Sequence, residues 1–364
     1  MEVLFAWVHV SDIHAGHGDA EHGHDQALVL NRLQQDLAEV LPREGIRPDV
    51  VLVTGDIAFS GGARVDPARP EDNAYARARA WLDQVASAAA VSSDKVFLVP
   101  GNHDVARTTK GLPFTLLKAL RAGHTTLDEA LSDTDSRTLL EGRLAEYVAF
   151  CHDLNPACAT IDGWSAALTG HDGLHIRLIG LNTALLCNDD KDHGVLRLSR
   201  AQLHPLTEAA PRDGEVILVM SHHPLDKGWL HEESYARGWV ENQAHIHLCG
   251  HVHEADSWGI QRGGASRPHV RIVAGATHEE KKPSGTPYRH GYNLGALVRG
   301  DQGNVELRVW PRRWSAKQAA FIVDGEAVTE PHSYAKHDLG IPLPHRAPTS
   351  TASPAPSKRA PEPP

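Results

Sequence analysis

Five short groups of polar residues each follow an apolar run of the chain, and each group contains side chains that can bind metal ions. In chain order they are Asp12-Ile13-His14, Gly55-Asp56, Gly101-Asn102-His103-Asp104, Ser221-His222-His223-Pro224 and Gly250-His251-Val252-His253. Any one of them alone is typical of a capped turn, but five independent turns do not collect the same ligand types by accident. Carboxylate oxygens and imidazole nitrogens without thiolates suit Mn²⁺, Fe or Zn²⁺. The sequence therefore predicts a centre for divalent metal ions.

The spacing within two of these groups supports a single shared site. Side chains two residues apart on an extended segment point the same way. Asp12 and His14, and likewise His251 and His253, can therefore each reach one small volume. Two cations held close together lower the pKa of a water between them and clamp a phosphoryl group. Catalysis at such a centre comes mostly from positioning and electrostatics.

The apolar runs before these groups predict the elements that position them. Along the first hundred residues, strand patterns alternate with helical patterns, which indicates an α/β sheet with parallel strands. These segments are 3–10, 28–41, 50–53, 73–90 and 96–99. In such sheets, ligands bind at the carboxyl ends of the strands. A second sheet packed on the first is predicted from later apolar runs at 174–181, 215–220, 246–248, 270–274, 294–299 and 304–310.

The order and spacing of the five groups resemble the calcineurin-like metallophosphoesterase superfamily. Its pattern is Asp-x-His, Gly-Asp, Gly-Asn-His-Asp or -Glu, His, and Gly-His-x-His, and the resemblance covers about residues 5 to 310. It implies a four-layer α/β/β/α sandwich of two mixed sheets flanked by helices. It also implies two divalent metal ions, with Mn²⁺ favoured over Fe, Zn²⁺ or Mg²⁺, and attack on phosphorus by a metal-bound hydroxide.

The resemblance also implies which residues would be metal ligands. One ion would be held by Asp12, His14, Asp56 and His253, and the other by Asp56, Asn102, His222 and His251, with Asp56 as the bridge.

Two histidines need a choice or a separate role. His222 is preferred to His223 because the family ligand usually lies two residues before the proline; His223 would point into the packing or toward the substrate. His103 would be catalytic, stabilising the transition state or protonating the leaving oxygen. Asp104 would orient His103 through a hydrogen bond and keep it protonated.

Two departures from the protein Ser/Thr phosphatases narrow the substrate class. In those enzymes a Val-Asp-Arg-Gly stretch follows the Gly-Asp group, whereas no such arginine follows Asp56 here. The third group ends in Asp104, where those enzymes have glutamate. The sequence looks closer to bacterial phosphodiesterase and exonuclease branches. We therefore expect a phosphodiester substrate: a nucleotide, a cyclic nucleotide or a short nucleic acid strand. The alternatives are a phosphomonoesterase or pyrophosphohydrolase, and a metal-loaded sensing or binding module in a larger complex.

Composition limits the other classes. The chain has 364 residues and a formal net charge of −10, which argues against a protein that coats nucleic acid by bulk charge. The sequence contains no run of about 18 apolar residues, so it predicts no membrane helix. The first residues indicate a strand instead of a signal peptide. Four cysteines without a CxxC pair indicate reduced thiols. We expect a cytoplasmic protein; any protein partners are unknown.

The predicted domain organisation has three parts. Residues 1–312 would form the metallophosphoesterase domain, with a helical insertion at about 106–168. This insertion would either overhang the site or be an ordinary group of packed helices. Residues 313–343 would be an extension packed on the domain, and 344–364 a disordered tail rich in proline, alanine and serine. The stretch from Trp310 to Trp314 mixes aromatic and basic residues, which suits either surface packing or a contact to ligand.

Overall fold

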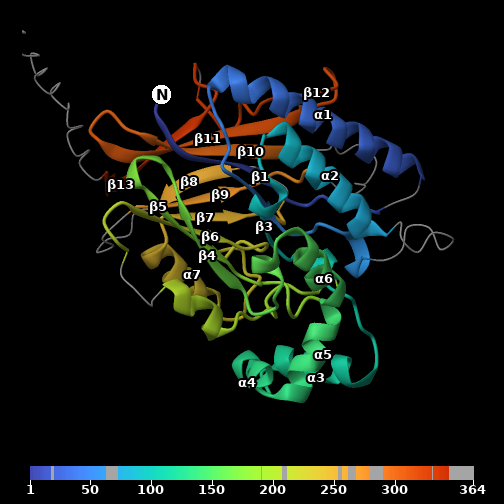
Figure 1. Ribbon diagram of the computed structural model, residues 1–364. Helices are drawn as coiled ribbons and strands as arrows, with labels where there is room; N and C mark the ends of the chain where they lie inside the picture. Colours follow the sequence, from blue (N-terminus) through green and yellow to red (C-terminus); the bar gives the residue numbers. More distant parts are fainter. Residues whose placement is uncertain are drawn as a thin grey trace, which may run out of the picture.

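Two mixed β-sheets packed face to face, with helices on their outer faces, make up the protein in this computed structural model (Figure 1). The structure describes residues 1–17, 20–62, 73–189, 191–206, 211–252, 256–260, 268–278, 290–329 and 331–343; for 20–24 and 206 it describes the backbone only. Helices α1 (Ala20–Glu44) and α2 (Ala74–Ala88) cover the first sheet, and α7 (Glu233–Gln243) covers the second. The predicted four-layer α/β/β/α sandwich is confirmed.

The first sheet is built around the N-terminal strand β1. Its members in the described part of the chain are β1 (Val3–Val10), β2 (Val50–Thr54), β3 (Val96–Val99), β10 (Gly291–Arg299), β11 (Asn304–Ser315), β12 (Ala320–Val323) and β13 (Ala335–Pro342). β1 runs parallel to β2 on one side and antiparallel to β10 on the other. The prediction that 294–299 and 304–310 belong to the second sheet is therefore wrong. Gly295 lies opposite Trp7 and leaves room for its indole, so β10 fits against β1.

The second sheet contains, among the described residues, β4 (Trp164–Thr169), β5 (His175–Gly180), β6 (Glu215–Met220), β7 (Ile246–Cys249), β8 (Asp256–Ile260) and β9 (His269–Val273). β5, β6, β7 and β9 are parallel neighbours, and all four were predicted. The sequence did not reveal β4 and β8, because these edge strands are partly exposed and carry no continuous apolar run.

The helical segment after β3 contains α3 (Gly111–Ala122), α4 (Leu127–Ser132), α5 (Thr134–Arg143) and α6 (Ala145–Leu154). The predicted range 106–168 runs past these helices into β4. Two arginines fasten the helices to the loop after β5: Arg143 donates to the carbonyls of Leu185 (2.9 Å) and Cys187, and Arg121 donates to that of Leu186 (2.7 Å). Arg121 is therefore a packing residue.

The stretch from Trp310 to Trp314 also serves packing. Trp310 is buried, and its N–H donates to Glu44 at 3.0 Å. The buried Arg312 guanidinium donates two hydrogen bonds to Asp36 of α1, at 2.6 and 2.8 Å. These contacts hold α1 on the sheet. β12 and β13 extend the same sheet, while residues 344–364 lie outside the described part of the chain.

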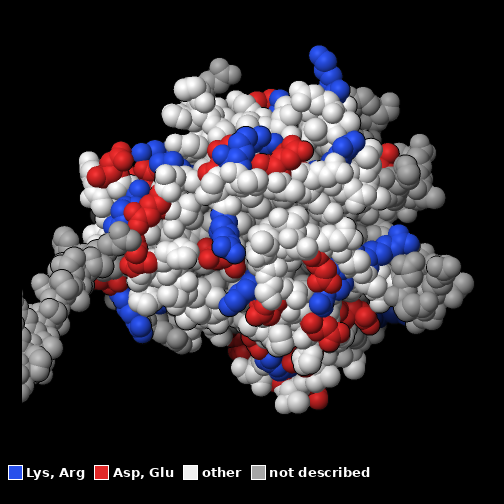
Figure 2. Space-filling model, turned by 45° about the horizontal axis from the view of Figure 1, so that its top comes forward, with Lys and Arg blue, Asp and Glu red and all other residues white. Residues whose placement is uncertain are grey.

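The described helices include none that is long and apolar enough to cross a membrane. On the face shown in Figure 2, basic and acidic side chains are interspersed over the described surface. All four cysteines are buried and unpaired.

Candidate metal centre

The polar groups after β1, β2, β3, β6 and β7 converge at the carboxyl ends of these strands. Carboxylate oxygens and ring nitrogens of three groups of residues lie within 4.8 Å of one another: Asp12, Asp56 and His222; His14, Asp56 and His103; His222, His223 and His251. His253, predicted as a ligand, lies outside the described residues.

Asp56 lies at the centre of the cluster. Its Oδ2 atom is 3.2 Å from His14 Nε2 and 3.3 Å from His222 Nε2. Its Oδ1 accepts a hydrogen bond of 2.8 Å from the backbone N–H of His103. One carboxylate oxygen thus faces ligands from both predicted halves of the centre, which supports the bridging role expected of Asp56.

The second half of the centre is built around His222. Its Nε2 lies 2.9 Å from Asn102 Oδ1 and 3.1 Å from His251 Nδ1. The backbone N–H of His251 donates to Asp12 Oδ2 at 3.1 Å, which joins the two halves. Each predicted ligand that the structure describes is therefore in contact with another one.

Two backbone carbonyls decide which ring nitrogens face the centre. His14 Nδ1 lies 3.1 Å from the carbonyl oxygen of His278, and His222 Nδ1 lies 2.8 Å from that of Thr54. A carbonyl only accepts, so each Nδ1 is the protonated nitrogen, and in a neutral ring Nε2 carries the lone pair. Both lone pairs then face the Asp56 carboxylate, an arrangement that is repulsive until a cation lies between them. The donor set therefore fits metal ions.

The pKa values of Asp56 and His222 also indicate that the cluster requires positive charge. Burial alone would raise the pKa of Asp56, but His222, His103 and His14 hold it well below its usual value. Burial opposes the charged form of His222, yet Asp56 raises the pKa of this imidazole to about 9. Without metal, a proton on His222 supplies the positive charge that Asp56 requires.

Four predicted ligands have left-handed backbone conformations, which non-glycine residues seldom adopt. The φ angles are 55° at Asp12, 50° at His14, 52° at Asp56 and 68° at His251. Such conformations cost about 1 kcal/mol or more each and concentrate at functional sites. Backbone hydrogen bonds maintain them: the N–H of Asp12 donates to Gly55 (3.0 Å) and that of His14 to Asp56 (2.9 Å).

Two glycines of the polar groups lie so close to neighbouring residues that a side chain would not fit. A Cβ atom on Gly101 would collide with the Asp56 carboxylate, and one on Gly250 would collide with Ser11 Oγ and lie 2.7 Å from Asp12 Oδ2. The loops can present their ligands this close together only because these two positions have no side chain.

His103 packs against aromatic rings beside the cluster. Its imidazole stacks on Phe59 with ring centroids 4.8 Å apart, and meets His14 edge-on at 4.9 Å. His17 contacts Phe59 at 4.3 Å. No sequence pattern singles out Phe59, although it follows Asp56 by three residues. The Phe59 ring thus holds the His103 imidazole at one side of the cluster.

Asp104 is buried and ties two loops together. Its carboxylate accepts hydrogen bonds from the backbone N–H groups of Ile57 (3.1 Å), Ala58 (3.0 Å) and Gly101 (2.8 Å) and from the Tyr75 hydroxyl (3.1 Å). Burial, and then the charge of Asp56, raises the pKa of Asp104 to about 6. This structural role was not predicted, and the action of Asp104 on His103 stays a prediction.

His223 points into the packing, one of the two options left open for it. Its Nδ1 lies 3.0 Å from Thr183 Oγ1 and its Nε2 3.9 Å from Cys187 Sγ. Burial lowers its pKa well below the usual value, so the ring is neutral. These contacts favour His222 over His223 as the ligand.

The residues whose carbonyls orient the predicted ligands could not be recognised from the sequence. Thr54 and His278 act through backbone carbonyls, which no side-chain pattern reveals. Trp229, which contacts His251 at 4.2 Å, could have been found as the aromatic residue in the loop that follows the His222 group.

Carboxylates and imidazoles gathered in this way at the strand ends of a four-layer sandwich are suited to holding divalent metal ions. The chain belongs to the calcineurin-like phosphoesterase family, whose sequence model matches residues 7–255. It is 25% identical over 290 residues to YydB, a metallophosphoesterase-like protein of Bacillus subtilis (strain 168), covering 76% of this chain and 54% of the relative. The chain thus spans about half the length of that relative.

Solved structures with a similar fold are more distant. A 5'-nucleotidase from Candida albicans SC5314 has 10% identity and a TM-score of 0.45, over 88% of this chain and 54% of that one. Wild-type Vps29 from Entamoeba histolytica, complexed with zinc, has 12% identity and a TM-score of 0.36, over 92% of this chain and 99% of that one. These two proteins are similar to this chain in fold alone.

Proposed function

We propose that this protein is a phosphodiesterase that works with two divalent metal ions, Mn²⁺ being favoured. The observation that carries the proposal is the arrangement around Asp56. Its Oδ2 is approached at 3.2 and 3.3 Å by the Nε2 atoms of His14 and His222, whose Nδ1 atoms are both engaged by carbonyls. A carboxylate so placed suits a bridge between two cations.

The residues divide into two groups of ligands around this bridge. Asp12, His14 and Asp56, with His253, would hold one ion, and Asp56, Asn102, His222 and His251 the other. When bound, the two ions would neutralise charge on the phosphoryl oxygens and generate a nucleophile from water near neutral pH. The carbonyls of Thr54 and His278 keep the two imidazoles aimed at the centre throughout.

His103 would give a proton to the leaving oxygen. It is half-buried, and its contacts with His14 and Phe59 place it at the edge of the cluster, outside the predicted ligand set. General acid catalysis from such a position contributes roughly 10²- to 10⁴-fold to the rate. The departing alcohol would then leave neutral instead of as an alkoxide.

A diester is the favoured substrate because the segment after Asp56 carries little positive charge. Residues 57–62, Ile-Ala-Phe-Ser-Gly-Gly, contain no lysine or arginine. A phosphodiester has a single negative charge at phosphorus, whereas a monoester approaches two near neutral pH and calls for additional cationic side chains. We place nucleotides, cyclic nucleotides and short nucleic acid strands in this class.

The test is hydrolysis of bis(4-nitrophenyl) phosphate beside 4-nitrophenyl phosphate, by metal-free protein and after addition of Mn²⁺. We expect the diester to be turned over faster, only with metal, and not by Asp56→Asn. A faster monoester would make the protein a phosphomonoesterase. No turnover of either ester by protein that contains two metal ions would favour a sensing module.

A further inference from the structure

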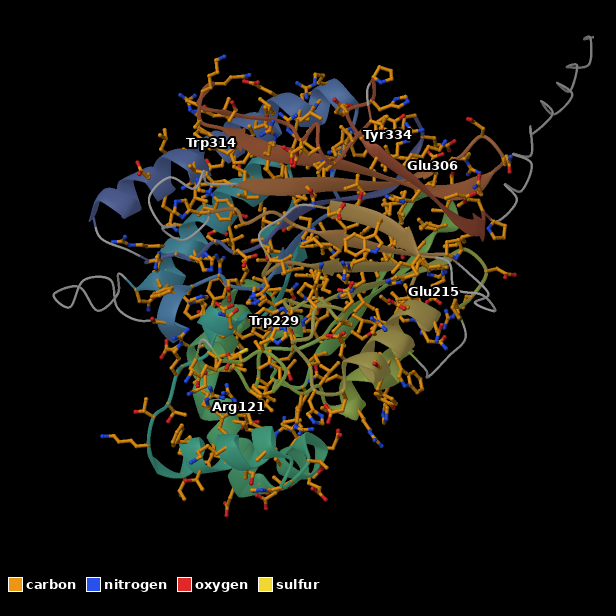
Figure 3. All side chains as sticks on the ribbon, turned by 180° about the vertical axis from the view of Figure 1, so that it is seen from behind. Arg121, Glu215, Trp229, Glu306, Trp314 and Tyr334 are labelled. Carbon is orange, nitrogen blue, oxygen red and sulfur yellow. The ribbon has the colours of Figure 1, made fainter. Side chains whose placement is uncertain are left out.

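Trp229 borders the metal centre on the side of His251. It lies in the segment between β6 and α7, and its ring is 4.2 Å from that of His251 at an interplanar angle of 87°, and 5.4 Å from that of His223. In Figure 3, Trp229 lies above Arg121. The indole is half-buried, so part of its surface is open beside a predicted ligand.

The indole N–H distinguishes Trp229 from three buried tryptophans. The N–H groups of Trp81, Trp164 and Trp310 donate to Leu30 (3.3 Å), Leu98 (2.8 Å) and Glu44 (3.0 Å), respectively. Among the described residues, nothing accepts a hydrogen bond from the N–H of Trp229. A large amphipathic ring with an available donor is a common contact for a ligand that is aromatic on one side and polar on the other.

Backbone contacts hold Trp229 in place. Its carbonyl accepts hydrogen bonds from the N–H groups of Gly194 (3.1 Å) and Leu196 (3.3 Å). Gly228 has a φ angle of 79°, and a Cβ atom there would lie 2.7 Å from the ring of His193, which itself contacts Trp229 at 5.0 Å. The indole is thus preorganised, and a ligand that stacks on it does not have to order it first.

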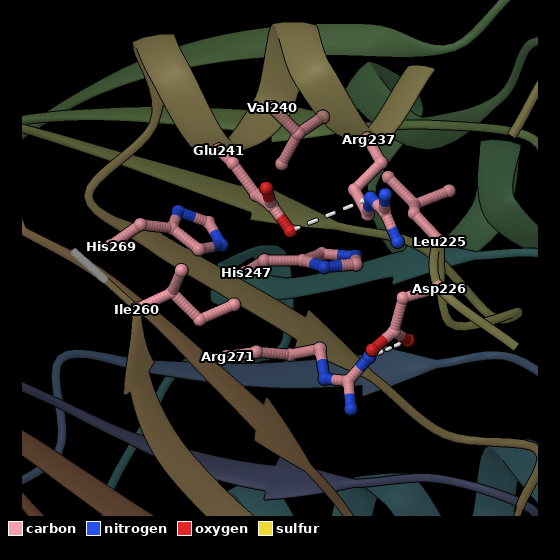
Figure 4. Close-up of a pocket in the computed structure, with 9 residues that line it drawn as sticks. All are labelled: Leu225, Asp226, Arg237, Val240, Glu241, His247, Ile260, His269 and Arg271. Carbon is pink, nitrogen blue, oxygen red and sulfur yellow. Dashed lines mark ion pairs between the residues drawn. The ribbon is translucent and has the colours of Figure 1, made fainter. Parts of the chain in front are cut away.

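A polar cluster under α7 anchors the same segment from the other side (Figure 4). Asp226, three residues before Trp229, forms an ion pair with the buried Arg271 of β9. The Arg271 guanidinium lies 3.5 Å from the centroid of the Trp258 ring. His247 bonds to Ser221 at 2.8 Å, next to His222. The loop that carries both the ligand and Trp229 is therefore fixed to the second sheet.

We propose that Trp229 stacks against a flat aromatic group of the substrate, so that the site prefers phosphodiesters carrying a nucleobase or aryl group over aliphatic ones. This proposal rests on the phosphodiesterase function proposed above. Phosphorus at the centre lies within a nucleoside's reach of the indole, because Trp229 touches His251 directly. Indole stacking tolerates every base, so the preference is for aromaticity and not for sequence.

The first experiment compares KM for bis(4-nitrophenyl) phosphate and a dinucleoside monophosphate with KM for glycerophosphocholine. We expect Trp229→Leu to raise KM about tenfold for the two aromatic diesters. KM for glycerophosphocholine and the metal content should stay the same, and Trp229→Phe should restore most of the affinity. The control is Trp239→Leu, on another partly buried tryptophan that lies on α7. Equal changes for all substrates, or none, would overturn the proposal.

Binding gives a second readout that needs no turnover. Calorimetric titration of Mn²⁺-loaded protein should show AMP binding more tightly than inorganic phosphate, and Trp229→Leu should remove the difference. If the wild-type protein hydrolyses aliphatic and aromatic diesters equally and binds AMP no better than phosphate, the stacking proposal fails while the phosphodiesterase proposal stands. If it hydrolyses no ester yet binds AMP through Trp229, the phosphodiesterase proposal fails while stacking on Trp229 stands.

Discussion

The imidazole of His103 lies nearly parallel to the phenyl ring of Phe59, with an interplanar angle of 23° and 4.8 Å between the ring centroids. The backbone N–H of Phe59 donates to Ala15 at 3.0 Å, which ties the phenyl ring to the loop that carries His14. The orientation of the proposed acid is therefore set by an aromatic contact on the loop that follows Asp56.

Replacing Phe59 by leucine removes this stack but keeps an apolar side chain. Aromatic pairs contribute about 0.5–1.5 kcal/mol beyond their buried area, so we expect kcat to fall about 2- to 10-fold with metal content unchanged. Phe59→Tyr keeps the ring and should retain most of kcat. Steady-state kinetics and metal analysis of the two variants test this prediction. An unchanged kcat in Phe59→Leu would show that the stack does not position His103.

The proposed ligands and the proposed acid can be separated by two substitutions. Asp56→Asn removes the negative charge between His14 and His222, so activity and bound metal should be lost together. His103→Ala should lower activity by roughly 10²- to 10⁴-fold while metal content stays near that of the wild type. Elemental analysis beside the diester assay gives both numbers. Equal loss of metal in the two variants would remove the distinction.

The left-handed conformation of His14 predicts an order of stability for two variants without the imidazole. In His14→Ala the Cβ atom keeps the steric cost of a φ angle of 50°, whereas His14→Gly removes it. We expect the metal-free glycine variant to be more stable than the alanine variant by about 1 kcal/mol. Denaturant unfolding in the presence of a chelator measures this difference, and a more stable alanine variant would contradict it.

A substitution at Gly250 tests whether the loop after β7 must pack closely against the loop after β1. A methyl group there meets Ser11 Oγ and Asp12 Oδ2, so Gly250→Ala should displace Asp12 and lower metal affinity. Gly238→Ala is the matched control, because a Cβ atom at that position on α7 has no neighbour within 4 Å. The control should keep its metal and gain up to about 1 kcal/mol of helix stability. Equal metal affinity in the two variants would refute this account of Gly250.

The buried His247 predicts a pH dependence of stability. Burial lowers its pKa from the ordinary 6.5 to about 3. The unfolded chain therefore binds the proton more readily, and the stability present above pH 6.5 is lost as the pH falls toward 3. At pH 5 this amounts to roughly 2 kcal/mol. Unfolding of metal-free protein between pH 7 and 5 should show a smaller loss for His247→Gln than for the wild type; identical slopes would count against it.

The sequence predicted the parallel strands and the groups at their ends because those strands are continuous buried apolar runs. It did not predict that β10 returns to pair with β1, since sheet membership depends on contacts between distant residues such as Trp7 and Gly295. It did not predict the hydrogen bonds of Asp104 either. Their partners are backbone N–H groups, whose positions become known only once the loops are placed.

The pairing of β1 with β10 has a consequence for biosynthesis. Asp12 and His14 follow directly on β1, yet one edge of β1 pairs with Gly291–Arg299, which lies well beyond the end of the family match at residue 255. A nascent chain that has emerged only as far as this boundary exposes an unpaired strand edge, which promotes aggregation. A gene fragment cut at residue 255 would therefore encode a chain that lacks β10 and leaves this edge of β1 without its partner strand.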